Sequence, residues 1–219
     1  MKINDNVIKS YLKNVFFING TACSGKSTIC KMLAEEFQMI HCEENFQLDK
    51  FLKIATPEEF PNLCYLKTMN SWEEFVSRKP REYSQWLRDT ADEMVSFELI
   101  EILSLPKDRL VIVDTNIPPE FLVKLCGYHN VAFLLSDEQM AIEGFFKRED
   151  HEKQFLLRII NDTPNPDITL KNFLEGIKLA NGSDVHNRFI NSGFKCFFRD
   201  ESTDINIRYK EIKEHFQLK

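Results

Sequence analysis

The most constraining feature of this sequence is a short loop that lies between an apolar run and a helical pattern. Residues 20–27 read Gly-Thr-Ala-Cys-Ser-Gly-Lys-Ser, which fits the pattern G-x-x-x-x-G-K-S. Glycines at the first and sixth positions let backbone N–H groups turn inward around a polyphosphate, and a following helix directs its positive dipole end at the same anion. The loop therefore predicts a site for a phosphorylated ligand.

Individual residues of this loop suit different parts of such a ligand. Lys26 supplies a mobile positive charge for the β and γ phosphates, and Ser27 supplies a hydroxyl suited to Mg²⁺. The residues expected to contact the nucleotide are Gly20, Thr21, Ala22, Cys23, Ser24, Gly25, Lys26, Ser27 and Thr28. The alternative is a chance match. The flanks favour a true motif, because residues 15–18 form an apolar strand pattern and residues 29–37 repeat apolar side chains at helical spacing.

Length, composition and charge predict one domain spanning residues 1–219 and narrow the range of partners. With 43% hydrophobic residues the chain can bury a full core. A net charge of −6 argues against nucleic acid or an anionic membrane surface as the main partner. The N-terminus lacks a signal-peptide pattern and no segment reaches the apolar length that spans a bilayer. We therefore expect a cytoplasmic protein, monomeric or homodimeric, with a small-molecule partner.

Six cysteines are present, without a C-x-x-C pair or a metal-ligand spacing to the histidines. This pattern argues against a zinc site or a disulfide framework, so most of these residues are expected to be reduced core thiols. Cys23 differs, because thiols near a helix N-terminus and a lysine are often reactive. Two interpretations of Cys23 remain open, an oxidation target and a tolerated residue at a variable motif position.

Strand and helix patterns alternate along the chain. Apolar runs predict strands at residues 15–18, 39–42, 109–114, 131–135 and 194–198. Apolar side chains at intervals of three and four predict helices at residues 26–37, 84–103, 170–181 and 204–216, the third ended by the pair Asn181-Gly182. Near-continuous apolar strands separated by helices predict a parallel sheet covered on both faces.

The loop at residues 20–28, together with the strand that ends at Asp114, resembles the P-loop kinases of the nucleotide, nucleoside and shikimate kinase type. The likeness in element order covers nearly the whole chain, whereas only the loop is motif-specific. It implies an α/β, three-layer doubly wound sandwich with a five-stranded parallel sheet in order 2-3-1-4-5, helices on both faces and a helical lid. Ligands would then bind at the carboxyl ends of the strands.

The resemblance also implies ATP and Mg²⁺ as cofactors and a role for Asp114. At the end of an apolar strand Asp114 would be a Walker B acid, which orients Mg²⁺ through water or takes the proton of the acceptor. The alternative is a carboxylate that caps the turn at residues 115–119. The family includes phosphotransferases that act on antibiotics, and no subfamily's substrate signature is present, so the acceptor stays open.

Two sets of charged residues are candidates for acceptor binding. Related kinases often place a carboxylate after the second strand to hold the acceptor hydroxyl, and arginines grip phosphate or carboxylate through two hydrogen bonds. If the second strand persists, Glu43 and Glu44 point to opposite faces. Solvated surface charges are the alternative for both sets. The carboxylates, together with Arg78 and Arg81, lie in or beside an aromatic-rich insert at residues 46–86. The full set of candidates is Glu43, Glu44, Asp49, Arg78, Arg81 and Arg88.

The segment at residues 142–165 matches the position of the family's mobile lid, whose arginines close over the transferring phosphoryl group. Arg148 is the best candidate for that cation, and Lys147, Lys153 and Arg158 are weaker candidates. The alternative is a static helix with exposed ion pairs four residues apart, such as Glu149 with Lys153.

Together these features predict Mg²⁺-dependent phosphoryl transfer from ATP to a small-molecule acceptor. Lys26, Asp114 and Arg148 would be the catalytic residues, and Ser27 and Asp114 would hold the metal. A nucleotide-binding regulatory protein or slow ATPase is one alternative, since a phosphate loop alone does not exclude it. An antibiotic phosphotransferase is the second. The base-reading N/T-K-x-D pattern of switch GTPases is missing from the sequence, and the insert at residues 46–86 fits an acceptor-binding region better than a switch loop.

Overall fold

Five parallel strands form one sheet at the centre of the structure, a computed structural model that describes residues 4–147 and 151–219. The spatial order is β2-β3-β1-β4-β5, which confirms the predicted topology of the α/β kinase-like fold. Register places Ile18 of β1 beside Asp114 of β3, so that both strands end at the same edge of the sheet. The strands are β1 (Val15–Gly20), β2 (Ile40–Cys42), β3 (Val111–Asp114), β4 (Val131–Ser136) and β5 (Lys195–Arg199).

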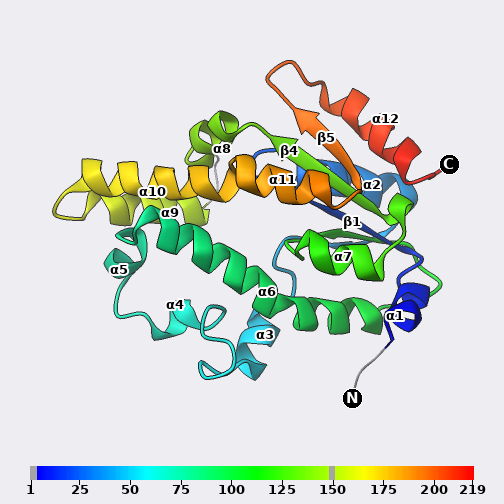
Figure 1. Ribbon diagram of the computed structural model, residues 1–219, viewed down its shortest axis with the longest axis horizontal. Helices are drawn as coiled ribbons and strands as arrows, with labels where there is room; N and C mark the ends of the chain where they lie inside the picture. Colours follow the sequence, from blue (N-terminus) through cyan, green and yellow to red (C-terminus); the bar gives the residue numbers. More distant parts are fainter. Residues whose placement is uncertain (1–3, 148–150) are drawn as a thin grey trace.

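Helices surround this sheet (Figure 1). Their bounds are α1 (Asp5–Tyr11), α2 (Lys26–Phe37), α3 (Leu48–Ile54), α4 (Tyr65–Thr68), α5 (Trp72–Val76), α6 (Pro80–Ser104), α7 (Pro119–Leu125), α8 (Glu138–Phe145), α9 (His151–Asn161), α10 (Pro166–Asn181), α11 (Ser183–Asn191) and α12 (Ile205–His215). Within the described ranges, none of these helices combines the length and apolar character needed to cross a membrane.

Two hydrophobic cores cover the two faces of the sheet, because successive strand residues point to opposite sides. Phe16 and Ile18 pack with buried residues of α2 and α12. Phe17 packs on the other face with buried residues of α6, α7 and α11. These cores give the three-layer arrangement predicted from the sequence.

A second, helical region extends from one side of the sheet (Figure 1). The N-terminal part of α6 packs there with α5, α9 and α10 around a core that includes Phe75, Tyr83 and Phe173. The insert is fixed to α6 by Glu93, whose carboxylate accepts hydrogen bonds from Asn62 N and Nδ2 and from Leu63 N. The middle of the insert is therefore anchored to α6, and several insert residues line the same cleft as the loop at residues 20–27.

Helix boundaries differ from the prediction at three places. Helix α10 begins at Pro166 rather than at residue 170, with a proline in its first turn. Helix α6 begins at Pro80 rather than at residue 84, because proline suits the first helical turn and Glu82 accepts a hydrogen bond from Lys79 N. Helix α10 does end at Asn181, but Gly182 has φ −84° and starts α11 directly. Gly182 is therefore a junction between two helices and not a left-handed cap.

Candidate active site

The glycine-containing loop lies at the carboxyl end of β1 and has the left-handed backbone that a phosphate cradle needs. Gly20, Cys23 and Gly25 have φ values of 140°, 60° and 96°. A Cβ atom at Gly20 would lie 1.8 Å from the carbonyl oxygen of Leu134, so only glycine fits beside β4. Helix α2 starts at Lys26 and directs its N-terminal dipole at the loop.

Hydrogen bonds to β4 hold the loop in this shape. Thr21 N donates to Leu134 O at 3.0 Å, and Thr21 Oγ1 accepts from Ser136 N at 2.7 Å. Ser136 Oγ donates to Ala22 O at 2.6 Å. The loop backbone is therefore preorganised by its own protein contacts.

Gly20→Ala is expected to lower the free energy of unfolding by about 3 kcal/mol or more, because the added methyl meets a backbone carbonyl in a left-handed conformation. Gly193→Ala is the matched control, since Gly193 also has positive φ (81°) but a Cβ there meets nothing within 4 Å. Backbone strain alone should then cost about 1 kcal/mol. Urea unfolding measures both variants, and equal losses would contradict the tight fit at Gly20.

Ser27 and Asp114 meet at the mouth of the loop although 87 residues separate them. Ser27 Oγ donates to Asp114 Oδ2 at 2.7 Å. Asp114 is only 2% exposed, and its Oδ1 atom has no hydrogen-bond partner among the described residues. Burial raises the pKa of Asp114, while Lys26 and Ser27 act in the opposite direction. Carboxylate and hydroxyl oxygens beside a phosphate cradle are ligands that suit Mg²⁺, so these residues fit that ion.

A large cleft of about 1660 Å³ opens from the loop toward the insert and the helical region. Small-molecule sites typically measure about 300–1,000 Å³, so this cleft has room for two ligands. Its polar lining includes Lys26, Ser27, Asn116 and Arg199, and its aromatic wall includes Trp72, Trp86 and Phe155. Two small molecules can therefore share one continuous space.

The predicted acceptor residues are divided between this cleft and a neighbouring cavity. Glu44, Asp49 and Arg88 line the cleft, whereas Glu43 is not part of its lining. Strand β2 ends at Cys42, so the strand alternation considered for Glu43 and Glu44 does not apply, and Glu44 accepts a hydrogen bond from Asn116 Nδ2 at 2.9 Å. Arg78, Arg81 and Arg88 line the second cavity, of about 790 Å³.

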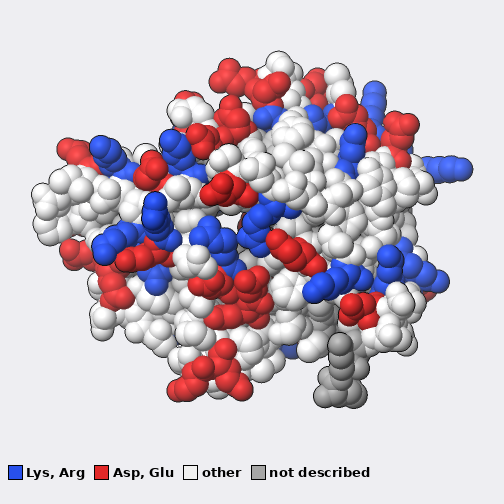
Figure 2. Space-filling view, viewed as in Figure 1, with Lys and Arg blue, Asp and Glu red and all other residues white. Residues whose placement is uncertain are grey.

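Arg88 and Arg78 differ in the intramolecular contacts that their guanidinium groups make. Figure 2 shows basic side chains in the strip between α10 and α6, where the second cavity lies. Arg88 donates to Ser84 Oγ at 2.9 Å and to Gln85 Oε1 at 2.7 Å, both neutral groups. The Arg78 guanidinium lies 3.6 Å from the centre of the Tyr65 ring. Arg88 is thus available to an anionic ligand, whereas Arg78 is part of an aromatic cluster.

The segment expected to be a lid, residues 142–165, includes the end of α8 and the whole of α9. Arg148, its leading candidate, lies outside the described residues, and so does Glu149. Lys153 lines the cleft, whereas Lys147 is exposed with its Nζ 3.6 Å from Glu143. Arg158 is exposed on α9.

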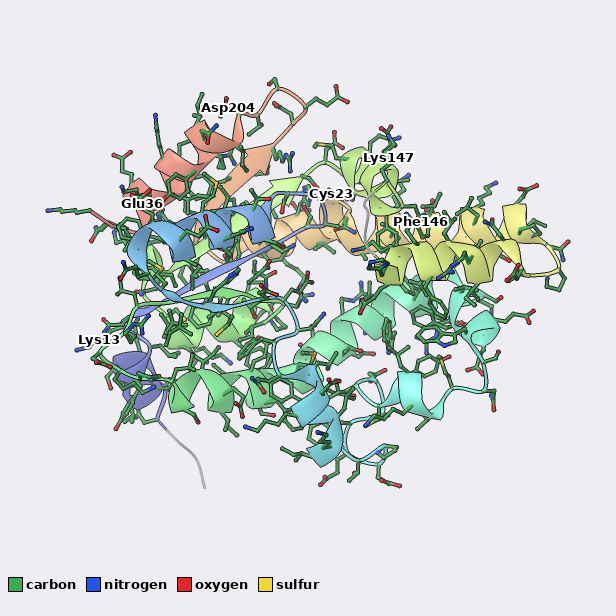
Figure 3. The ribbon with its side chains drawn as sticks, turned by 180° about the vertical axis from the view of Figure 1, so that it is seen from behind. Lys13, Cys23, Glu36, Phe146, Lys147 and Asp204 are labelled. Atoms are coloured by element: carbon green, nitrogen blue, oxygen red, sulfur yellow. The ribbon has the colours of Figure 1, made fainter. Side chains whose placement is uncertain are left out.

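Helix α8 contacts the phosphate loop directly. A Cβ atom at Gly144 would lie 2.6 Å from Cys23 Sγ, so the thiol packs against the backbone of α8. Figure 3 shows Cys23 near Phe146 and Lys147, where the loop and the end of α8 meet. Four of the other cysteines are buried, as expected for core thiols. Movement of α8 would therefore change the packing around Cys23.

Two polar residues that hold the loop were not identified from the sequence. Asn181 Oδ1 accepts from Ala22 N at 2.6 Å. Arg199 Nη1 donates to Cys23 O at 2.8 Å and lines the cleft. Both residues lie far from the loop in the chain. The only local signal in the sequence was the charge of Arg199 at the end of the fifth strand.

Comparison with known proteins finds only distant similarity to solved structures. No family model matches the sequence, and no curated protein matches it. The chain is similar to a shikimate kinase from Acinetobacter baumannii solved with shikimate, at 11% identity and a TM-score of 0.45, over 98% of this chain and 99% of that one. It is also similar to an uncharacterized protein from Eubacterium ventriosum, at 16% identity and a TM-score of 0.41, over 94% of this chain and 100% of that one. Function is therefore inferred from the geometry of the site.

Proposed function

We propose that this protein is a phosphotransferase that moves the γ-phosphoryl group of ATP to a small-molecule acceptor in a Mg²⁺-dependent reaction. The observation that carries the proposal is the 2.7 Å hydrogen bond from Ser27 Oγ to Asp114 Oδ2 beside the phosphate cradle. The second oxygen of Asp114 is buried and lacks a hydrogen-bond partner among the described residues. A buried, half-satisfied carboxylate is costly, and a cation ligand at this position would satisfy it.

Each part of the site has a role in this reaction. The loop amides and Lys26 hold the donor phosphates, and Ser27 and Asp114 would hold Mg²⁺. When bound, the ion would neutralise charge on the β and γ phosphates. The protein contributes mainly positioning and electrostatic stabilisation, because phosphoryl transfer demands little covalent chemistry from side chains.

The cleft supports an acceptor rather than a purely regulatory role. It continues from Lys26 to the aromatic wall formed by Trp72 and Trp86. Glu44 and Asp49 are carboxylates in this space that could take a proton from an acceptor hydroxyl, and Arg88 could pair with an acceptor anion. A nucleotide-binding regulator would not need these groups.

The test is an activity screen with γ-labelled ATP. Acceptors should include nucleosides, nucleoside monophosphates, sugars, shikimate, and aminoglycoside and phenicol antibiotics. The expected result is transfer of the label to one class of acceptor. This transfer should be lost when EDTA removes Mg²⁺. ATP binding with only slow hydrolysis, whichever acceptor is added, would favour the regulatory alternative.

Arg148→Ala is expected to lower kcat by about 10²–10³-fold while the Kd for ATP changes by less than about threefold, because a lid cation meets charge that develops during transfer. Lys171→Ala is the control, since Lys171 is exposed on α10 outside the lid segment, and it should leave kcat unchanged. Hydrogen exchange over residues 142–165, with and without a bisubstrate analogue, measures lid closure. Equal protection in both states, together with normal kcat, would leave a static helix.

A further inference from the structure

Helix α6 carries a buried carboxyl group that the reaction described above does not use. Glu98 is 3% exposed, and its Oε2 atom accepts a hydrogen bond from Thr115 Oγ1 at 2.7 Å. Burial raises the pKa of Glu98 to about 7, although the Thr115 hydrogen bond acts in the opposite direction. Apolar residues of similar volume are often as stable or more stable at such positions, so core packing alone does not account for Glu98.

A chain of hydrogen bonds, buried except at its last bond to Gly20 N, leads from Glu98 to the phosphate loop. Thr115 Oγ1, which donates to Glu98, accepts from Ile117 N at 2.9 Å. Ile117 O accepts from Asn19 Nδ2 at 2.7 Å, and Asn19 Oδ1 accepts from Gly20 N at 2.5 Å. Thr115 and Asn19 are only 1% and 3% exposed, so water does not compete for these bonds.

The two ends of this chain lie in different parts of the site. Gly20 is the first residue of the phosphate loop and has the left-handed φ of 140° on which the loop shape depends. Glu98 lies one turn beyond Met94, and residues 87–94 of α6 contribute Leu87, Arg88, Thr90, Ala91 and Met94 to the cleft wall. The hydrogen bonds therefore join the helix that lines the acceptor side to the turn that holds the donor phosphates.

We propose that Glu98 is a positioning residue that, through Thr115, Ile117 and Asn19, fixes the backbone of Gly20 in its phosphate-binding shape. Its effect on nucleotide affinity rests on the proposed function, whereas its effect on the loop backbone does not. The carboxylate accepts from Thr115, which directs the hydroxyl lone pairs toward Ile117 N and so orders the turn that receives Asn19. Loss of the acceptor at Glu98 should loosen the loop while the sheet stays folded.

The experiment compares variants that delete the bond with variants that keep it. Glu98→Met and Thr115→Val remove it with little change in volume, whereas Glu98→Gln and Thr115→Ser retain it. The first pair should raise the Kd for ATP about tenfold, within the range found for residues that couple without touching a ligand. The second pair should stay within about threefold of wild type. Thr115→Val also removes the bond that Ile117 N donates to Thr115 Oγ1. Because the bond to Glu98 is already lost in that variant, the double variant Glu98→Met/Thr115→Val should show about the same Kd as Thr115→Val alone.

Two further measurements distinguish this positioning role from an effect through Asp114 and from the general loss of a buried hydroxyl. Titrations are run in EDTA as well as in Mg²⁺, because Thr115 follows Asp114, and the loss should be the same in both. Hydrogen exchange of residues 19–28 in the nucleotide-free protein should be faster in Glu98→Met and Thr115→Val. Thr169→Val is the control, because it removes a buried hydroxyl of α10 that is bonded to Thr163 and not to the loop. It should change neither readout.

The outcomes distinguish the inference from the proposed function. Wild-type exchange at residues 19–28 in folded Glu98→Met and Thr115→Val would overturn the positioning role, whether or not ATP binds. A loss seen only with Mg²⁺ would also overturn it, because the effect would then act through Asp114. Failure of Glu98→Gln to restore the loop would show that the hydrogen bond is not the cause. Wild-type protein that binds no ATP, with loop exchange still faster in the deletions, would refute the proposed function alone.

Discussion

Lys26→Ala is expected to lower kcat at least about 10³-fold and to weaken ATP binding while the protein stays folded. In the proposed reaction the lysine would supply the mobile cation for the β and γ phosphates, and an alanine would supply none. The fold should survive because, within residues 4–147 and 151–219, Lys26 Nζ donates only to Thr21 O, at 3.1 Å, and that oxygen also accepts from Ser24 Oγ at 2.8 Å. Calorimetric ATP titration and a coupled phosphoryl-transfer assay measure the two effects.

Lys31→Ala is the matched control for that experiment. Lys31 lies on the same helix, is 71% exposed and faces Glu35 at 4.0 Å, a surface pair of little energetic weight. It should leave ATP affinity and turnover within about twofold of wild type. A folded Lys26→Ala protein with unchanged affinity and turnover would contradict the assignment of the phosphate loop.

The sheet and the loop at residues 20–27 were predictable because their signals are local. Apolar runs marked every strand, and the loop motif placed Lys26 and Ser27 at the start of α2, whose bounds match the predicted helix. Once the strand order followed from the resemblance, Asp114 had to lie near Ser27, because β1 and β3 are neighbours. Short-range sequence patterns determine these features with little help from the rest of the chain.

The rest of the site was less predictable because it depends on contacts between distant segments. No local pattern indicates that Asn181 reaches Ala22 or that Arg199 reaches Cys23. The insert also forms three short helices whose positions depend on packing against α6. Such contacts are set by tertiary structure, which overrides weak local propensity.

The helical pattern of the sequence does contain a signal that singles out Glu98. It lies four residues after Met94 and four before Ile102, both buried, so a carboxylate occupies the apolar face of α6. A charge on a buried helix face requires a partner. The sequence does not indicate which partner, because Thr115 lies beyond the end of β3.

Asp114→Asn is expected to lower kcat by about 10²–10³-fold while ATP still binds. Asparagine has nearly the same shape, and its amide oxygen can accept the hydrogen bond that Ser27 now donates to Asp114. The negative charge that would hold Mg²⁺ is lost, whereas the loop amides and Lys26 remain to bind phosphates. Affinity and turnover should therefore separate in this variant.

The stability of the Asp114→Asn protein relative to wild type should increase as the pH rises. Burial raises the pKa of Asp114 above its ordinary value of 3.8, so folding favours the protonated carboxyl. The stability that this group contributes is present below its unfolded pKa and is lost as the pH rises through its folded pKa. Asparagine is neutral throughout, so the free energy of unfolding of Asp114→Asn relative to wild type should be greater at pH 7 than at pH 4.

Urea unfolding at the two pH values, combined with steady-state kinetics, tests both expectations for Asp114. Asp108→Asn is the control, since it makes the same charge change at an exposed residue before the amino end of β3. It should alter neither turnover nor the pH dependence of stability. Near-normal turnover in Asp114→Asn would reduce this residue to a cap of the turn after β3, because a carboxylate needed for the metal cannot be replaced by a neutral amide without loss of rate.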